Sequence, residues 1–129
     1  HYVGHVFEDI CMQYIKKLNQ AQKLPLFYEK IGKWWGTDNR KKVQSEIDIM
    51  AIGREGAIFA ECKYRNKQTS EKVLNSLIEK TKHFPYENKY YFLFSKSGFT
   101  QSLLNRASEN HNIELYNLDD LFCQRCAYK

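Results

Sequence analysis

Four charged residues lie within a short stretch whose pattern is typical of a β-hairpin. Residues 44–65 have the sequence QSEIDIMAIGREGAIFAECKYR. Apolar and polar residues alternate in Gln44–Ile52 and in Ala57–Tyr64, and glycines flank the turn between them, which predicts two antiparallel strands. The charged residues of interest are Glu46, Asp48, Glu61 and Lys63.

The register of this hairpin decides which charges meet. A two-residue turn, or a four-residue loop, puts Asp48 directly opposite Glu61. The same register puts Glu46 opposite Lys63, although a β-bulge in either strand would break it. Like charges in directly opposed positions are destabilising, so two carboxylates there either share a proton or bind a cation.

A divalent cation at this pair would favour chemistry on phosphates. Mg²⁺ and Mn²⁺ prefer oxygen ligands and often take one or two carboxylates together with waters. Lys63 could hold an attacking water or neutralise charge on a phosphate. Asp48, Glu61 and Lys63 therefore suit metal-assisted hydrolysis of phosphodiester bonds.

An ordinary explanation of the same charges is a cross-strand ion pair on a solvated face. Side chains alternate along a strand, so every second residue lies on the same face. In each strand, one such face is expected to carry two charged residues and two apolar residues. The two sets are Glu46, Asp48, Met50 and Ile52, and Ala57, Phe59, Glu61 and Lys63. A face that is covered at the turn and charged at the other end favours a cleft over a solvated surface.

A third carboxylate could join from the predicted first helix, Tyr2–Ala21. Apolar residues recur there at intervals of three and four and form one broad stripe. Glu8 falls at the edge of that stripe, whereas Asp9 points to solvent. We therefore expect Glu8 to face the acidic end of the hairpin and to contribute to the metal site.

The other elements predict an α/β fold. The expected strands are Leu26–Trp35, Lys89–Phe94 and Asn112–Leu118, and the expected helices are Ser70–Phe84, Phe99–Ala107 and Asp119–Ala127. In the Ser70–Phe84 helix, Lys72, Lys80 and Lys82 fall mostly outside the apolar side. The apolar run Lys89–Phe94 suits a strand that is covered on both faces. The order α-β-β-β-α-β-α-β-α implies a sandwich with a mixed central sheet flanked by helices.

Length and charge set limits on the whole. The 129 residues suit a single domain over 1–129, with a net charge of +5 that permits a nucleic-acid partner. No apolar run approaches the roughly 18 residues of a membrane span, and no signal peptide is visible, so we expect a cytoplasmic protein without a membrane partner. Since no Met begins the chain, we expect a fragment of a longer protein.

The cysteines offer little chemistry. They are Cys11, Cys62, Cys123 and Cys126. The last two form a single CxxC, but no second pair completes a zinc site, so reduced thiols are favoured.

Aromatic and basic residues supply candidates for nucleic-acid binding. Of the adjacent Trp34 and Trp35, one is expected in the core while the other is exposed. An exposed Trp35 could stack on a base, or both could pack against neighbouring elements. The candidate phosphate contacts, which could equally be solvated residues, are Arg40, Lys41, Lys42, Arg65 and Lys67.

The motifs EIDI and ECK, separated by a hairpin turn, resemble the PD-(D/E)XK nuclease superfamily, which includes restriction endonucleases and archaeal Holliday-junction resolvases. The resemblance implies a restriction-endonuclease-like sandwich that acts on nucleic acid, DNA above all. It implies Asp48 and Glu61 as ligands of Mg²⁺ or Mn²⁺, Lys63 as the catalytic lysine and Glu8 as the helix carboxylate. Ile47 stands where the superfamily name has proline, which is a common variation.

The motifs YVGHVFEDIC, IGKWWG, EIDIMAI and FAECKYR resemble the C-terminal domain of archaeal-type ATPases, the domain of unknown function 234. The resemblance implies that the full-length protein carries a P-loop ATPase module and binds ATP there. This chain itself has no GxxxxGK[ST] loop for ATP. Related nucleases often dimerise, so a homodimer is among the expected assemblies.

Three functions remain open. The first is a divalent-metal nuclease. The second is a catalytically silent module that binds nucleic acid or regulates the ATPase. The third is a structural cap of an oligomeric ATPase, which the opposed carboxylates argue against.

Overall fold

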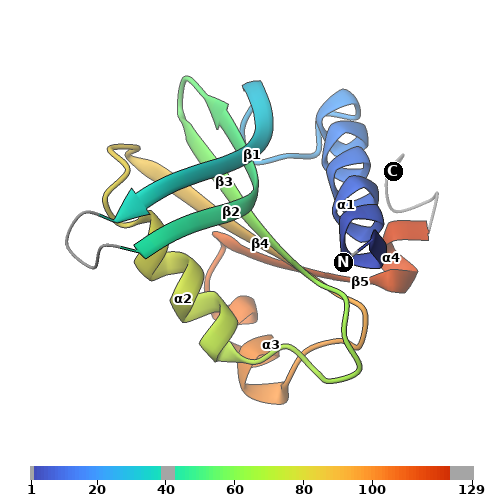
Figure 1. The fold of residues 1–129 in the computed structure, drawn as a ribbon. Helices are drawn as coiled ribbons and strands as arrows, with labels where there is room; N and C mark the ends of the chain where they lie inside the picture. Colours follow the sequence, from blue (N-terminus) through green and yellow to red (C-terminus); the bar gives the residue numbers. More distant parts are fainter. Residues whose placement is uncertain (1, 39–42, 123–129) are drawn as a thin grey trace.

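The computed structural model describes residues 2–38 and 43–122. The elements follow the order that the sequence predicts, with boundaries shifted by a few residues (Figure 1). They are α1 (Tyr2–Gln20), β1 (Tyr28–Asp38), β2 (Val43–Gly53), β3 (Gly56–Lys63), α2 (Glu71–Thr81), β4 (Asn88–Ser95), α3 (Gln101–Glu109), β5 (Ile113–Asn117) and α4 (Leu118–Phe122). Cys123 and Cys126 lie outside the described residues.

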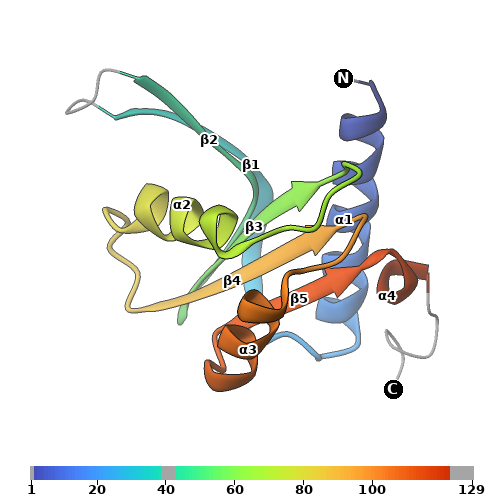
Figure 2. The ribbon, with the colours of Figure 1, turned by 90° about the horizontal axis from the view of Figure 1, so that it is seen from below.

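The strands form one mixed sheet in the order β1-β2-β3-β4-β5. Its first three strands are antiparallel neighbours, whereas β3, β4 and β5 run parallel. The parallel pairs require crossover connections, and α2 and α3 provide them. These two helices cover one face of the sheet and α1 covers the other with α4, so the predicted α/β sandwich with a mixed sheet is confirmed (Figures 1 and 2).

Each face of the sheet has its own core. The α1 face buries Phe7, Cys11, Tyr14, Ile15, Leu18, Leu26, Ile49, Ala51, Ile58, Ala60, Phe92, Phe94 and Leu121. The α2 face buries Ile47, Met50, Ala57, Phe59, Leu74, Leu77, Tyr91, Leu93, Phe99, Leu103 and Ile113. Because β4 contributes to both cores, its near-continuous apolar sequence follows from burial on two sides.

Side chains before α2 and α3 cap the helices. The Ser70 hydroxyl accepts a hydrogen bond from the Lys72 backbone N–H at 3.4 Å. The Thr100 hydroxyl does the same for Leu103, also at 3.4 Å. These caps satisfy backbone donors that have no partner inside a helix. In the described part of the chain, every helix is too short or too polar to cross a membrane.

The strand β2 leaves β3 halfway along its length. Residues Ile49–Ile52 pair with Ala57–Ala60 in the register that the sequence predicts. Among the described residues, this ladder ends at the pair of Ile49 with Ala60, so the predicted pairing of Asp48 with Glu61 is not part of it. The predicted pairing of Glu46 with Lys63 is wrong for the same reason, because β2 continues only beside β1. Figure 2 shows β1 and β2 curving together away from the other strands.

Candidate active site

A β-bulge in β2 sets the direction of the acidic side chains. Asp48 and Ile49 of β2 lie together opposite the single residue Lys33 of β1. A bulge adds one residue to a strand and so changes the face that the following side chains occupy. As a result, Ile47 and Met50 both pack in the core against α2 although they are three positions apart.

The bulge corrects the predicted sharing of one face. Strict alternation placed Glu46 and Asp48 on the same face as Met50. In the structure, Met50 is in the α2-side core, whereas Glu46 and Asp48 line a pocket beside α1 with Glu8. Glu8 lies in this pocket with the acids of β2, as expected, whereas Asp9 is exposed as expected but also lines the same pocket.

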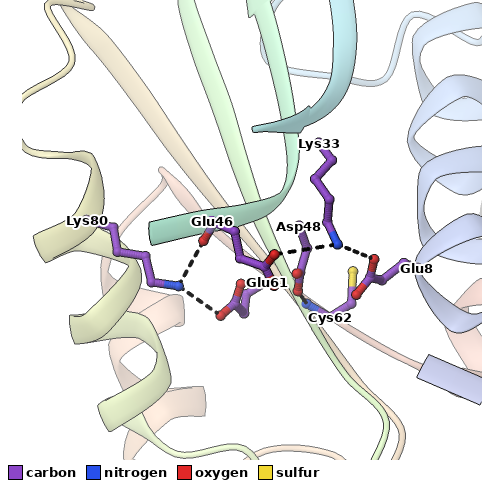
Figure 3. A network of polar contacts seen from close by, with 7 residues as sticks. All are labelled: Glu8, Lys33, Glu46, Asp48, Glu61, Cys62 and Lys80. Carbon is purple, nitrogen blue, oxygen red and sulfur yellow. Dashed lines mark hydrogen bonds and ion pairs between the residues drawn. The ribbon is translucent and has the colours of Figure 1, made fainter. Parts of the chain in front are cut away.

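The carboxylates of Asp48 and Glu61 form a buried acidic pair at the point where β2 and β3 separate (Figure 3). Their exposed fractions are only 9% and 8%. The backbone N–H of Cys62 donates a hydrogen bond to Asp48 Oδ2 at 2.9 Å. Burial, together with the neighbouring Asp48 charge, raises the pKa of Glu61 to about 7. The influence of Asp48 on the Glu61 pKa shows that the two carboxylates are close, although β2 and β3 are not paired at these residues.

Two lysines oppose this buildup of negative charge. Lys80 of α2 places Nζ 3.5 Å from Glu61 Oε2 and donates a hydrogen bond to the Glu46 backbone oxygen at 3.1 Å. Lys63 places its Nζ 3.8 Å from the same oxygen of Glu61. Both lysines lower the pKa of Glu61, but their effect is smaller than that of burial and Asp48. The result is a carboxyl group that titrates near neutral pH.

Lys33 joins a second pair of acids on the other side of Asp48. Its Nζ lies 3.1 Å from Glu8 Oε1 and 3.9 Å from Glu46 Oε2 (Figure 3). Burial alone would lower the pKa of Lys33, but the contact with Glu8 and the charges of Glu46 and Asp48 raise it overall. Lys33 is therefore a fixed positive charge between α1 and β2.

The pocket over this network has a volume of about 500 Å³. Its charged lining is mainly acidic, because four carboxylates face it along with Lys33. The four are Glu8, Asp9, Glu46 and Asp48. Among residues 2–38 and 43–122, no three His, Cys, Asp or Glu side chains are grouped so as to hold a metal ion by themselves.

The two adjacent tryptophans separate as predicted. Trp34 packs edge-on against Phe84, with ring centroids 5.0 Å apart, whereas Trp35 is 65% exposed. Trp35 lines the same pocket as Asp48, and Lys33 Nζ lies 5.3 Å from the centre of its ring. An exposed indole is thus available at the mouth of the acidic pocket.

The predicted phosphate contacts are only partly described. Arg65 and Lys67 follow β3 directly; Arg65 is half-buried and Lys67 is exposed. Arg40, Lys41 and Lys42 lie outside the described residues. The described basic residues of this set therefore lie on the segment that leaves the Lys63 end of β3.

Sequence reasoning missed Lys33 and Lys80 as members of the site. The prediction that Lys80 falls outside the apolar side of α2 overlooked its position three residues after the buried Leu77, at the edge of the buried stripe. For Lys33, the signal is its alternation with Trp34, whose ring is on the opposite, α2 face of the sheet. Neither signal indicates which acidic side chain the lysine contacts.

The chain is similar in sequence to a protein from an archaeon. The chain is 29% identical over 125 residues to the uncharacterized protein MJECL04 of Methanocaldococcus jannaschii, with 92% of this chain and 26% of that protein covered. The chain thus spans about a quarter of the length of this curated relative.

Solved structures with low sequence identity share the fold. Protein VC1899 from Vibrio cholerae superposes with a TM-score of 0.61 at 15% identity, covering 84% of this chain and 29% of that one. A protein of unknown function, AF1548, gives 0.52 at 17% identity over 87% of this chain and 60% of its own. A repair endonuclease from Pyrococcus abyssi gives 0.50 at 14% identity over 86% of this chain and 46% of its own.

The sequence profile of one family matches residues 1–75, which is more than half of the chain and includes α1, the β2–β3 hairpin and the acidic pair. That family, the domain of unknown function 234, is described as "Archaea bacterial proteins of unknown function". The chain belongs to this family and has a restriction-endonuclease-like fold.

Proposed function

We propose that this domain is a divalent-metal-dependent nuclease that hydrolyses phosphodiester bonds in nucleic acid, with DNA as its main substrate. The observation that supports the proposal is the buried pair of Asp48 and Glu61 with Lys63 beside it. Burying two adjacent carboxylates is costly unless a cation compensates them. A purely structural role gives no reason for such a pair.

The acidic pair fits Mg²⁺ or Mn²⁺. A pair of carboxylates matches the ligand set that these ions commonly complete with waters in proteins. In this proposal Asp48 and Glu61 are the direct ligands, and Glu8 supports the ion from α1. The ion would neutralise charge on the phosphate and lower the pKa of a bound water.

The chain's own residues prepare the site for this chemistry. The Cys62 N–H fixes the orientation of the Asp48 carboxylate, and Lys80 holds Glu61 from α2. Lys63 is the group that would position the attacking water or stabilise the charge that develops on the phosphate. Its place two residues after Glu61 on β3 puts both side chains at the same end of the strand.

The nucleic acid would bind across the mouth of the pocket. Trp35 would stack on a base, and phosphates would contact the candidate basic residues of the sequence. These are Arg40, Lys41, Lys42, Arg65 and Lys67. We further propose that the domain is attached to a P-loop ATPase module in the full-length chain, and that two copies pair as in related nucleases.

A cleavage assay tests the proposal. Labelled single-stranded, duplex and four-way-junction DNA is incubated with the protein and Mg²⁺ or Mn²⁺, with a chelator as the metal-free arm. The Asp48→Asn variant should lose at least about 100-fold in rate, since it removes a charge that holds the metal. Glu109→Gln, an exposed acid on α3, is the matched control and should cleave like the wild type.

The exposed Trp35 favours a second candidate, a module that binds nucleic acid without cleaving it. The same assay separates the two candidates when binding is measured alongside cleavage. Binding that is unchanged in Asp48→Asn, with no cleavage of any substrate by the wild type, would favour the silent module. Metal-dependent cleavage that is lost in the variant would favour the nuclease.

A further inference from the structure

The acidic end of the site contains more carboxylates than a single metal ion needs. Asp48 and Glu61 form the buried pair, and Glu8 and Glu46 lie on the opposite side of Asp48. In many hydrolytic sites such additional acids hold a second metal ion. Here their nearest positive partner is Lys33, which reaches from β1 into the space between them (Figure 3).

The geometry of Lys33 is that of an internal counter-ion. Its Nζ is 3.1 Å from Glu8 Oε1, which is hydrogen-bonding distance, and 3.9 Å from Glu46 Oε2. The side chains of Lys33 and Glu8 are each 24% exposed, so the contact is shielded from solvent more than an ordinary surface ion pair. Lys33 also lies directly opposite the bulge that places Asp48, which ties its position to that of the metal ligand.

The balance of charge limits how many ions the site can take. Four carboxylates, Glu8, Glu46, Asp48 and Glu61, are opposed by the ammonium groups of Lys33, Lys63 and Lys80. Together with the exposed Asp9, which lines the same pocket, these acids leave a net charge of about −2, which one divalent cation neutralises. A second divalent cation at Glu8 and Glu46 would have to approach the ammonium group of Lys33, which already contacts both acids, at a distance where like charges repel strongly.

We infer that Lys33 takes the place of a second metal ion, so that this site binds one divalent cation at Asp48 and Glu61. The inference rests on the proposed function, because it assumes that the acidic pair binds the first ion. Lys33 is a positioning residue in this account. Its ammonium group neutralises Glu8 and Glu46, so that these two acids do not hold a second ion.

Calorimetric titration of Mn²⁺ into the chelator-treated chain tests the inference without any activity readout. The wild type should bind one Mn²⁺ at saturation. Lys33→Met removes the charge but keeps a chain of similar length, so Glu8 and Glu46 become free to hold a second Mn²⁺ and the stoichiometry should rise to two. Lys33→Arg keeps the charge and should bind one ion.

The control is Lys30→Met on the same strand, which changes an exposed lysine outside the pocket and should bind one ion. Circular dichroism of each variant establishes that the fold is retained. Two ions in the wild type, or one ion in a folded Lys33→Met variant, would overturn the inference while leaving the nuclease proposal intact. A wild type that binds no Mn²⁺ and cleaves no DNA in the same preparation would overturn both the single-metal inference and the nuclease proposal.

Discussion

The two halves of β2 differ in what surrounds them. Residues Met50–Ile52 pair with β1 on one side and with β3 on the other, and Ile49 pairs with β3; the side chains of this half contribute to both cores. Toward the start of the strand, Glu46 and Asp48 keep β1 as a neighbour, but the described ladder with β3 has ended. The bulge at Asp48 and Ile49 marks the change from one half to the other.

This difference shows how a site arises from an incomplete sheet. Where β2 leaves β3, the Cys62 N–H donates to the Asp48 carboxylate, in the region where a continued ladder would have occupied it. Backbone groups freed in this way must find another partner, and a carboxylate is a strong one. The apolar half of β2 is therefore paired on both sides, whereas the acidic half has no strand pairing with β3 and places carboxylates there.

Truncating the core beside the apolar half should have the largest effect on stability. Phe59 is fully buried and stacks with Phe84 and Tyr91 at centroid distances of 5.4 and 6.0 Å. Phe59→Ala should lower the free energy of unfolding by about 3–5 kcal/mol, measured by urea denaturation. Phe27→Ala, at a position that is 67% exposed, is the control and should cost less than about 1 kcal/mol. Equal losses would contradict the assignment of Phe59 to the core.

The buried Glu61, which lies beside the acidic half of β2, should make the metal-free protein less stable as the pH rises. Because the pKa of Glu61 is raised to about 7 in the fold, from 4.5, the folded state binds its proton more tightly than the unfolded state. Well below pH 4.5 the Glu61 carboxyl is protonated in both states and does not affect the free energy of unfolding. Between about pH 4.5 and 7 its ionisation in the unfolded state lowers the free energy of unfolding, by about 3 kcal/mol in all.

Glu61→Gln removes this titration and is the variant with which to isolate it. The difference in free energy of unfolding between wild type and variant should move in favour of the variant from pH 4.5 to 7, in the presence of a chelator. Saturating Mg²⁺ should abolish that trend, because a cation stabilises the ionised carboxylate. A difference that does not change with pH would mean that Glu61 ionises normally in the fold.

Much of the fold follows from local pattern. The stripe of α1, the buried run of β4 and the turn between β2 and β3 are each visible in a single segment, so the order of elements and half of the hairpin register could be predicted. The closeness of Asp48 and Glu61 was predicted from ladder pairing, which the structure does not have at these residues, whereas the position of Glu8 follows from the stripe of α1.

The remaining details depend on contacts between segments. The bulge consists of two residues of β2 that lie opposite the single residue Lys33 of β1. The alternation of residues within β2 alone does not indicate it. The turning of Glu46 away from Lys63 follows from that bulge. Lys80 contacts Glu61 because of the rotation of α2 about its axis. That rotation depends on the packing of Leu74 and Leu77 against the sheet, which is a contact between distant segments.

The measurement that tests the central claim most directly is the single-turnover rate of DNA cleavage in Lys63→Met at saturating Mg²⁺. Lys72→Met, which removes an exposed lysine on α2 that has no proposed role in binding, is the matched control. If Lys63 acts on the water or the phosphate, its variant should cleave about 100-fold more slowly at unchanged DNA affinity, while the control keeps the wild-type rate. Equal rates for Lys63→Met and the wild type would contradict the proposal that the acidic pair and its lysine form a catalytic site.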